Sequence, residues 1–427
     1  MTASGVRTDG DGAAQLVEHL FRRQSGQLVA TLTRVLGARH VALAEDAVQD
    51  ALVAALQTWP FRGVPDRPEA WLFQVARNRA RDRLRHGRMV GARAARLPVA
   101  PPVAGADGDA RLRGETEPLS DDQLGLMSLT CHPALTADAR VALTLRLVGG
   151  FSVAEIARAG LASATTVAQR LVRAKRQLRE IDAAFGVPAG AALTDRLASM
   201  QASVYLLFNE GYAATAGDQL VRRDVAGEAL RLGRLLAAHP DTGTPASWAL
   251  LSLMLLHAAR FDARVGEDGV PFLLDAQDRS RWDGALAAEG LRALDRAASG
   301  EVVSAYHLEA GIAACHVTAP SWEATDWPAI LSLYDDLLAL TGSPVVAVNR
   351  SIALAHVEGP LAGLAALDPV TSDARLAGLH WLPAVQGALW RDAGERGRAL
   401  AAFRAARALA GTLPERRWLD VQISALA

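Results

Sequence analysis

The chain has 427 residues, half of them apolar, which suffices for two to four domains and excludes a wholly disordered protein. Its net charge of −1 hides an asymmetry: residues 1–186 carry 25 basic and 19 acidic side chains, and residues 187–427 carry 20 and 27. A basic front half joined to an acidic back half indicates a polyanion-binding module attached to a part with another role.

Cysteine usage and hydropathy indicate the compartment. Cys131 and Cys315 lie far apart in sequence, which excludes a disulfide framework or a zinc site and fits a reducing cytosol. The N-terminal residues lack the apolar core of a signal peptide, and runs such as WALLSLMLLHAA (248–259) are too short to cross a bilayer. We therefore expect a cytoplasmic protein with no membrane partner.

Apolar residues recur at helical spacing along nearly the whole chain, and no stretch alternates convincingly as a strand does. This predicts an all-α protein. Composition divides it into a first helical module over 13–88, a flexible linker rich in Ala, Gly and Pro over 89–120, a second module over 121–185, and, after the break GVPAG, a helical extension over 190–427.

The first module ends in RNRARDRLRHGR (77–88), with six arginines in twelve residues. On a helix, four of them fall within about 80° of one another: Arg77, Arg81, Arg85 and Arg88. Arg79 and Arg83 point to the far side, and Phe73, Ala76, Ala80 and Leu84 form an adjacent apolar face. Such a stripe suits phosphate binding, but a charged, solvated surface helix explains it equally well when this helix is taken alone.

The second module contains a helix-turn-helix pattern, GFSVAEIARAGLASATTVAQRLVRAKRQLR (150–179). We expect a short helix over 153–159, a turn at 160–162 and a second helix capped by Ser163. A buried stripe is predicted on one side (Val167, Leu171, Ala174, Leu178), opposite side chains that can contact base edges and phosphates (Thr166, Gln169, Arg170, Arg173, Arg176). The plainer alternative is an ordinary helical hairpin with a basic solvent face.

The extension is predicted to be helical, with breaks at HPD (239–241), APSW (319–322), GSP (342–344) and LDP (367–369). In residues 380–411, the small and aromatic residues fit a tetratricopeptide-like helix pair, in which small residues allow close approach and aromatic ones fill the groove: Gly387, Trp390, Ala399, Phe403 and Ala406. The usual proline after the second helix is replaced by Gly411.

The extension contains no nucleophile–base spacing, glycine-rich phosphate loop or paired metal ligands, so we expect no catalytic residue, no metal and no cofactor. Its most unusual run is DAQDRSRWD (275–283). One interpretation is a salt-bridged loop that clamps two helix pairs. The other is a regulatory contact formed by Asp278, Arg279 and Arg281 and anchored by Trp282.

Taken together, EDAVQDALVAALQTWP (45–60), PEAWLFQVARNRARDRLR (68–85) and the helix-turn-helix resemble, in that order, regions 2 and 4 of a bacterial RNA polymerase sigma factor of the extracytoplasmic-function type. Further segments resemble a subgroup that carries a long tetratricopeptide-like C-terminal extension: LTCHPALTADARVALTLRLVGGFS (129–152), LLFNEGY (206–212), DAQDRSRWD, ATDWPAI (324–330) and SPVVAVNRSIALA (343–355). The resemblance covers nearly the whole chain.

The resemblance implies roles for particular residues. Asp46, Gln49 and Asp50 match the surface that binds core RNA polymerase, at the β′ clamp helices; the β subunit is a further expected contact. The residues that match the part of the family that binds and opens the −10 promoter element are Trp71, Arg77, Asn78, Arg81, Arg85 and Arg88. The loop 61–68 corresponds to the place where the family captures a flipped base. The −35 reader corresponds to Ser163, Thr165, Thr166, Gln169, Arg170, Arg173 and Arg176.

The resemblance also implies that the extension tunes activity, through an intramolecular contact with the sigma core or as a sensor surface. Three residues depart from the family pattern: Gly160 in the turn, Ala168 at an often basic position, and Ala276 where relatives carry an acid. The alternative function is a polymerase-independent helix-turn-helix regulator whose repeats sense a ligand or protein. A third interpretation is a scaffold whose basic helices are merely solvated.

Overall fold

The computed structural model describes residues 24–94, 119–157, 163–181, 183–212, 221–266 and 270–427, apart from the side chains of 87–94 and 119–121. Across these residues the chain is helical, and the only β-type pairing is an isolated bridge between Val265 and Pro271. The all-α prediction is therefore confirmed. The chain divides into two compact units, Met1–Ser203 and Val204–Ala427.

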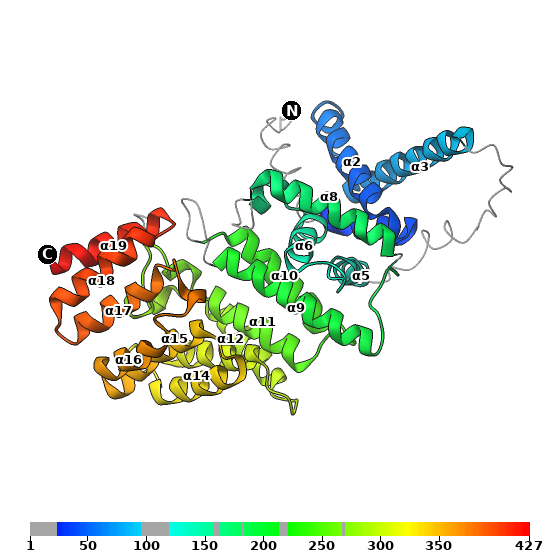
Figure 1. The fold of residues 1–427 in the computed structure, drawn as a ribbon. Helices are drawn as coiled ribbons and strands as arrows, with labels where there is room; N and C mark the ends of the chain where they lie inside the picture. Colours follow the sequence, from blue (N-terminus) through cyan, green and yellow to red (C-terminus); the bar gives the residue numbers. More distant parts are fainter. Residues whose placement is uncertain (1–23, 95–118, 158–162, 182, 213–220, 267–269) are drawn as a thin grey trace, which may run out of the picture. The chain divides into compact units, whose positions relative to one another are not determined.

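The first described helix of this unit covers residues 24–36. The elements that follow are η1 (Ala38–His40), α2 (Val41–Arg62), α3 (Pro68–Ala94), α5 (Leu119–Thr130), α6 (Ala137–Leu143), the π-helical turn η2 (Thr144–Val148), α7 (Val153–Ile156), α8 (Ala164–Ile181) and the first turns of α9 (Ala191–Tyr212) (Figure 1). Most of the predicted linker, residues 95–118, lies outside the described residues.

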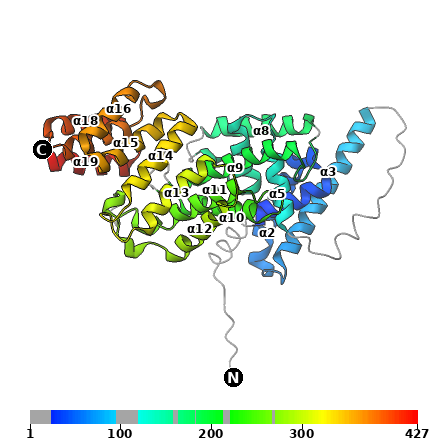
Figure 2. The ribbon, with the colours of Figure 1, turned by 90° about the horizontal axis from the view of Figure 1, so that it is seen from below.

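Helix α3 is longer than the sequence indicated. Regular structure was predicted to stop at residue 88, but the helix continues to Ala94. The added residues, MVGARA, include good helix formers (Met, Ala and Arg) beside the weaker Val90 and Gly91. In Figures 1 and 2 the far end of α3 extends beyond the helices of this unit on which its beginning packs.

Two close contacts join helices of the first unit. Trp59 near the end of α2 packs on Trp71 in α3, with ring centroids 5.6 Å apart. The first helix lies against η2 at Gly26, where an added Cβ would fall 2.0 Å from the carbonyl oxygen of Val148. Only glycine permits this approach of two backbones.

In the second unit, α9 is followed by α10 (Arg223–Ala238), α11 (Pro245–Ala258), α12 (Gly284–Ala297), α13 (Ala305–Thr318), α14 (Trp327–Thr341), α15 (Pro344–Glu358), α16 (Pro360–Leu367), α17 (Trp381–Asp392), α18 (Arg396–Leu409) and α19 (Leu413–Leu426). Short 3₁₀ turns, including η4 (Phe261–Ala263), η5 (Leu274–Ala276) and η6 (Arg279–Arg281), join some of them. Successive helices of this unit stack against one another (Figures 1 and 2).

The predicted breaks coincide with helix ends in this unit. For example, α14 ends at a left-handed Gly342 with φ of 57°, and α15 begins at Pro344. Glycine tolerates the left-handed conformation, and proline at the first helical position lacks only an amide hydrogen that has no helical partner there. These local signals explain why the sequence located the breaks.

The α17–α18 pair has the close approach expected of a tetratricopeptide-like hairpin. A Cβ on Gly387 would fall within 2.9 Å of the Phe403 ring, and Phe403 itself is fully buried. Ala399 and Ala406 are also fully buried on α18. The small residue on one helix thus makes room for the aromatic residue of the other.

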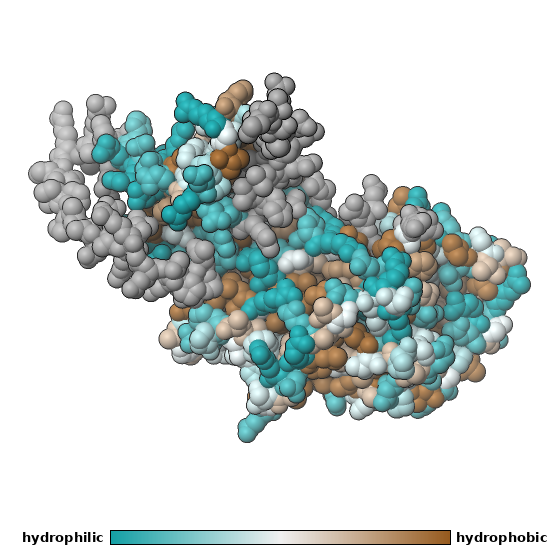
Figure 3. All heavy atoms as spheres, turned by 180° about the vertical axis from the view of Figure 1, so that it is seen from behind, coloured by the Kyte–Doolittle hydropathy of each residue, from teal (hydrophilic) through white to brown (hydrophobic). Residues whose placement is uncertain are grey.

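None of the described helices is long and apolar enough to span a membrane. On the face seen in Figure 3, apolar side chains lie interspersed among polar ones.

Candidate nucleic-acid and polymerase interfaces

Helix α8 is the second helix of the predicted helix-turn-helix. Its start is stabilised as expected, because the Thr166 amide donates to Ser163 Oγ at 3.2 Å. The predicted stripe packs inward, with exposed fractions of 4% or less on all four side chains: Val167, Leu171, Ala174 and Leu178. The turn residues 158–162, which include Gly160, lie outside the described residues. The buried stripe fixes which side of α8 remains outward.

The outward side of α8 carries most of the predicted −35 residues. Those with exposed side chains are Ser163, Thr165, Thr166, Gln169, Arg173 and Arg176. Arg170 differs, since its guanidinium pairs with Asp138 of α6 at 2.9 Å and its side chain is 22% exposed. The helical projection of α8 alone cannot reveal this carboxylate of α6, and the contact of Arg170 with DNA stays a prediction.

The preceding helix α7 is a single turn with a reciprocal cap. The Glu155 amide donates to Ser152 Oγ, and the Ser152 amide donates to Glu155 Oε2 at 2.8 Å. Ile156 is fully buried. The cap and this one apolar anchor hold α7 in place despite its shortness.

On α3, the predicted −10 residues are not equally free. Asn78, Arg81 and Arg85 are exposed, whereas Trp71 and Arg77 are half-buried. Arg88 lies in the helix, but its side chain is outside the described residues.

The buried face of α3 also differs from the prediction in phase. Its fully buried side chains are Leu72, Ala76 and Ala80, while the predicted Phe73 and Leu84 are half-buried. The three buried residues are spaced four apart, so the contact with α2 is centred slightly to one side of the predicted face. That shift explains why Arg77 is partly covered.

The predicted polymerase-binding residues lie on α2. Asp46 is 65% and Asp50 35% exposed, and Gln49 is half-buried. Arg83 of α3 reaches both acids, at 2.6 Å from Asp50 and 3.6 Å from Asp46. The sequence placed Arg83 away from the arginine stripe, and this ion pair accounts for its position.

Glu45, next to these acids, was missed. It is 3% exposed and accepts hydrogen bonds from Arg146 of η2, at 2.6 Å, and from Lys175 of α8. A signal was present, because Glu45 occupies an otherwise apolar helical position four residues after Val41 and seven before Leu52, both buried. An acid at such a position indicates a buried partner.

The loop between α2 and α3 begins beside an exposed aromatic ring. Phe61 is 88% exposed, and Gly63 ends α2 with φ of 80°. The sequence assigned the loop as a whole. Within residues 61–68, Phe61 has the most exposed large apolar side chain.

Comparisons with known proteins assign families to the segments described above. Family models for Sigma-70 region 2 and Sigma-70 region 4 match residues 20–89 and 128–178, and a family of unknown function (DUF6596) matches 196–298. The RNA polymerase sigma factor CarQ of Myxococcus xanthus is 33% identical over 171 residues, covering 40% of this chain and 91% of CarQ.

The chain is a sigma factor of the extracytoplasmic-function type with a helical C-terminal extension. An uncharacterized protein of Rhizobium meliloti (strain 1021) is 37% identical over 411 residues, which is 94% of this chain and 95% of that protein. No solved structure matches this sigma factor.

In the extension of the sigma factor, the run 275–283 is held by caps and stacking. Asp283 accepts from the amides of Ala285 and Leu286 at the start of α12, and Asp278 accepts from the Ser280 amide. No residue of this run forms an ion pair with another described residue. The described residues thus show no ion pair of the kind that the salt-bridged loop requires, and two of the three acids, Asp278 and Asp283, accept from backbone amides instead.

Arg279 in the same run points into the second unit. Its Nη1 donates to the carbonyls of His316 at 2.7 Å and Ala319 at 2.8 Å, and its guanidinium lies 4.5 Å from the Trp282 ring centroid. Arg281 and Asp278 remain exposed. Of the four predicted contact residues, these two are thus the exposed ones. No cluster of His, Cys, Asp and Glu in the described part of the chain has the composition of a metal site.

The first turns of α9, which open the extension, contact the helix-turn-helix module within the first unit. Arg196 Nη1 donates to the Ser128 carbonyl at 2.6 Å, and Arg140 Nη1 donates to Ser199 Oγ at 2.7 Å. Cys131 Sγ lies 3.5 Å from Ser203 Oγ. Burial raises the pKa of Cys131. These contacts place the start of the extension on α5 and α6.

Proposed function

We propose that this sigma factor binds core RNA polymerase through α2, holds the −10 element along α3, reads the −35 element with α8, and so initiates transcription. In this proposal, residues 13–88 form the polymerase and −10 module, 89–120 the linker, 121–185 the −35 module and 190–427 a regulatory extension. The polymerase surfaces would be the β′ clamp helices and the β subunit.

The observation that carries the proposal is the division of α8 into two faces. Four side chains on one face are buried, whereas the other face presents hydroxyl, amide and guanidinium groups to solvent. Hydroxyl and amide groups can hydrogen-bond base edges in the major groove, and arginines can bind guanine or phosphate. A helix whose inner face is fully packed can present these groups in a fixed geometry.

The −10 part of the proposal rests on α3 and the loop before it. Arg81 and Arg85 are exposed on one side of α3 and suit backbone phosphates, and Asn78 nearby can hydrogen-bond a base. The exposed Phe61 ring offers a surface on which an unstacked base can lie. The acids of α2 suit a basic helical partner, and their pairing with Arg83 would be exchanged on binding.

The test is transcription in vitro by core polymerase on a pool of random-sequence templates, with and without the full chain. We expect the chain to direct transcripts from a shared upstream motif. Arg81→Ala with Arg85→Ala should reduce these transcripts at least about tenfold, since each lost phosphate contact weakens binding. Arg79→Ala is the matched control, an exposed arginine on the opposite side of the same helix.

Two results would contradict the proposal. One is equal loss of transcription in the Arg79 variant, which would assign the effect to helix charge and not to a DNA-binding face. The other is sequence-specific DNA binding by the chain alone, unaffected by Asp46→Ala with Gln49→Ala. That result would instead support the polymerase-independent regulator.

For the extension, we propose that it regulates the sigma core through the contact that the first turns of α9 make with the helix-turn-helix module. The support is the set of contacts that α9 makes with Ser128, Cys131 and Arg140. A regulator attached at α5 and α6 can affect how α8 is held, because α6 and α8 pack together.

A further inference from the structure

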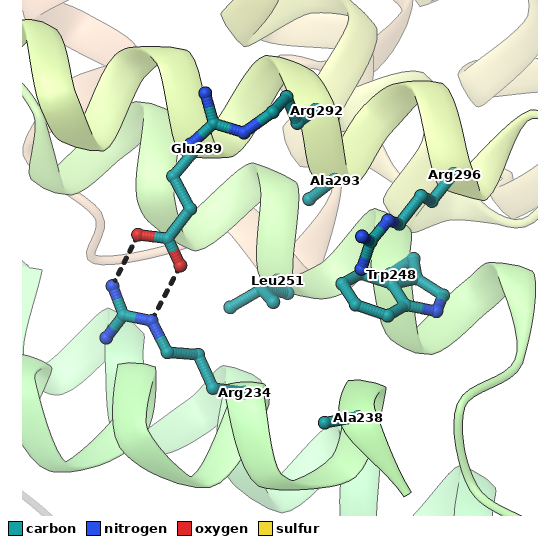
Figure 4. Close-up of a pocket in the computed structure, with 8 residues that line it drawn as sticks. All are labelled: Arg234, Ala238, Trp248, Leu251, Glu289, Arg292, Ala293 and Arg296. Carbon is teal, nitrogen blue, oxygen red and sulfur yellow. Dashed lines mark hydrogen bonds and ion pairs between the residues drawn. The ribbon is translucent and has the colours of Figure 1, made fainter. Parts of the chain in front are cut away.

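The second unit has a cleft between α10, α11 and α12 (Figure 4). Its volume is about 250 Å³, and its lining consists of Arg234, Ala238, Trp248, Leu251, Glu289, Arg292, Ala293 and Arg296. Half of these residues are apolar or aromatic and three are arginines. The cleft therefore combines an apolar floor with a cationic rim.

One wall of the cleft is fixed by an ion pair. Arg234 donates from Nε and Nη2 to both oxygens of Glu289, at 2.7 and 2.8 Å, and the two side chains face each other in Figure 4. Hydrogen bonds from Arg234 lower the pKa of Glu289, so this carboxylate remains charged at neutral pH. The single carboxylate in the lining is thus already matched by an arginine.

The other two arginines are held less directly: the charge of Arg292 helps to lower the pKa of Glu289, and Arg296 lies over the Trp248 ring. Neither Arg292 nor Arg296 forms an ion pair with another described residue. They lie four residues apart on α12, a spacing at which like charges repel. Glu289 and Asp295, each three residues from Arg292 on α12, offset part of this repulsion, and an anion bound between the two arginines would offset more of it.

The apolar part of the lining defines the rest of the ligand. Arg296 lies over the Trp248 ring, 4.6 Å from its centroid, which holds both groups at the edge of the cleft. Leu251 and Ala293 are each 3% exposed and form the floor. A bare inorganic anion would leave this surface unused, and a volume of 250 Å³ is below that of sites for drug-sized ligands.

We propose that the cleft binds a small organic carboxylate with a compact apolar body. The carboxylate accepts hydrogen bonds from Arg292 and Arg296, and the body lies against Trp248 and Leu251. The extension would thereby carry a ligand site that is independent of the promoter and polymerase surfaces.

The test is ligand-observed NMR on the full chain with phenylacetate as the probe. Because the probe is small, we expect a dissociation constant on the order of a millimolar. Benzylamine has the same ring with the opposite charge and should not bind. Arg292→Gln with Arg296→Gln should weaken phenylacetate at least about tenfold, since two charge-assisted hydrogen bonds are lost. Arg281→Gln, an exposed arginine outside the cleft, is the matched control.

A second variant tests the site by volume. Ala238 is exposed on α10, so the Ala238→Trp side chain should fill the cleft and abolish phenylacetate binding without changing a buried residue. Circular dichroism verifies that both variants fold. Binding of phenylacetate that survives in both folded variants overturns the proposal, as does equal binding of benzylamine. Binding of a blocked aspartyl-phenylalanine dipeptide without binding of phenylacetate also overturns it, because the occupant would then be a protein segment.

Discussion

Adjacent charged residues in this sigma factor have opposite environments. Glu45 is buried between Arg146 and Lys175, and its neighbour Asp46 is largely exposed and faces Arg83. The peptide backbone of α2 turns by about 100° between them, which suffices to move a carboxylate from core to solvent. An acidic side chain therefore has a structural role at one position and is exposed to solvent at the next.

Glu45→Gln should lower the stability of the first unit by about 3 kcal/mol, because it leaves two partly buried cations without their counter-charge. Asp46→Asn should cost less than about 1 kcal/mol, since solvent screens this pair and the atoms are 3.6 Å apart. Hydrogen exchange of amides in α2 and α8, measured on the full chain, reports the change within this unit. Equal protection in the two variants would show that the Glu45 network contributes no more than a surface pair.

Two glutamates of the second unit give opposite dependence of stability on pH. Burial raises the pKa of Glu309, although the Tyr205 hydroxyl donates a hydrogen bond to its Oε2 at 2.5 Å. Its favourable contribution is therefore present below the ordinary pKa of 4.5 and is lost as the pH rises through the raised value. Glu309→Gln should be more stable than the parent at about pH 7.5, with a smaller difference at about pH 5.

Glu289→Gln is the control of opposite sign. Because Arg234 lowers the pKa of Glu289, its contribution is present above the ordinary value and is lost as the pH falls. This variant should be less stable than the parent at about pH 7.5, and the deficit should shrink on acidification. Calorimetric midpoints at the two pH values check both. A Glu309 variant that loses stability at the higher pH would mean that the carboxylate is needed in its charged form.

At the level of elements, helices were predictable because their signals are local. The stripe on α8 and the break at Gly342–Pro344 depend on residues within a few positions of one another. The phase of α3 and the orientation of Arg170 were not predictable, since they depend on packing against other helices, α2 in the first case and α6 with Asp138 in the second. The spacing of apolar residues locates the buried face of a helix to within about one residue. Which side chains beside that face are also buried depends on the helix that packs against it.

The α17–α18 hairpin allows a test of close packing between elements. Gly387→Ala places a methyl group 2.8 Å from the Phe403 ring, so we expect a loss of about 1–3 kcal/mol in the unfolding free energy of the second unit. Gly397→Ala, on α18 with no neighbour within 4 Å, should be neutral or stabilising by up to about 1 kcal/mol.

Adding Phe403→Leu to Gly387→Ala distinguishes overpacking from a backbone effect. If the clash with the ring causes the loss, the double variant should be more stable than the sum of the two single changes predicts. Urea unfolding of the four proteins gives this coupling. Strict additivity would indicate that the helices separate to admit the methyl group at no cost to their contact.

At the scale of the whole molecule, the division into units differs from the division by composition. The sequence breaks at GVPAG before α9, but the two compact units meet at Ser203 and Val204, inside that helix. The first three turns of α9 belong with the helix-turn-helix module through Arg196, Ser199 and Ser203. Composition detects where a loop lies, but the boundary of a compact unit depends on which surfaces the next helix covers.

This difference predicts how truncated chains behave. A chain ending at residue 186 lacks the turns of α9 that cover Cys131, whereas a chain ending at residue 203 retains them, and both lack Cys315. Cys131 is therefore the single thiol in each. It is fully buried in the folded unit, and burial raises its pKa, so it should react slowly with a thiol reagent in the longer chain.

In the shorter chain the thiol loses its Ser203 neighbour and its cover, so we expect the rate of modification to rise at least about tenfold as local opening becomes easier. Titration with an aromatic disulfide measures the rate, and Cys131→Ser in each chain gives the background. If both chains react at the same rate, α9 does not support the module. If only the shorter chain reacts, its transcription defects would report a damaged helix-turn-helix module. The chain ending at residue 203 is then the correct one in which to measure what the rest of the extension contributes.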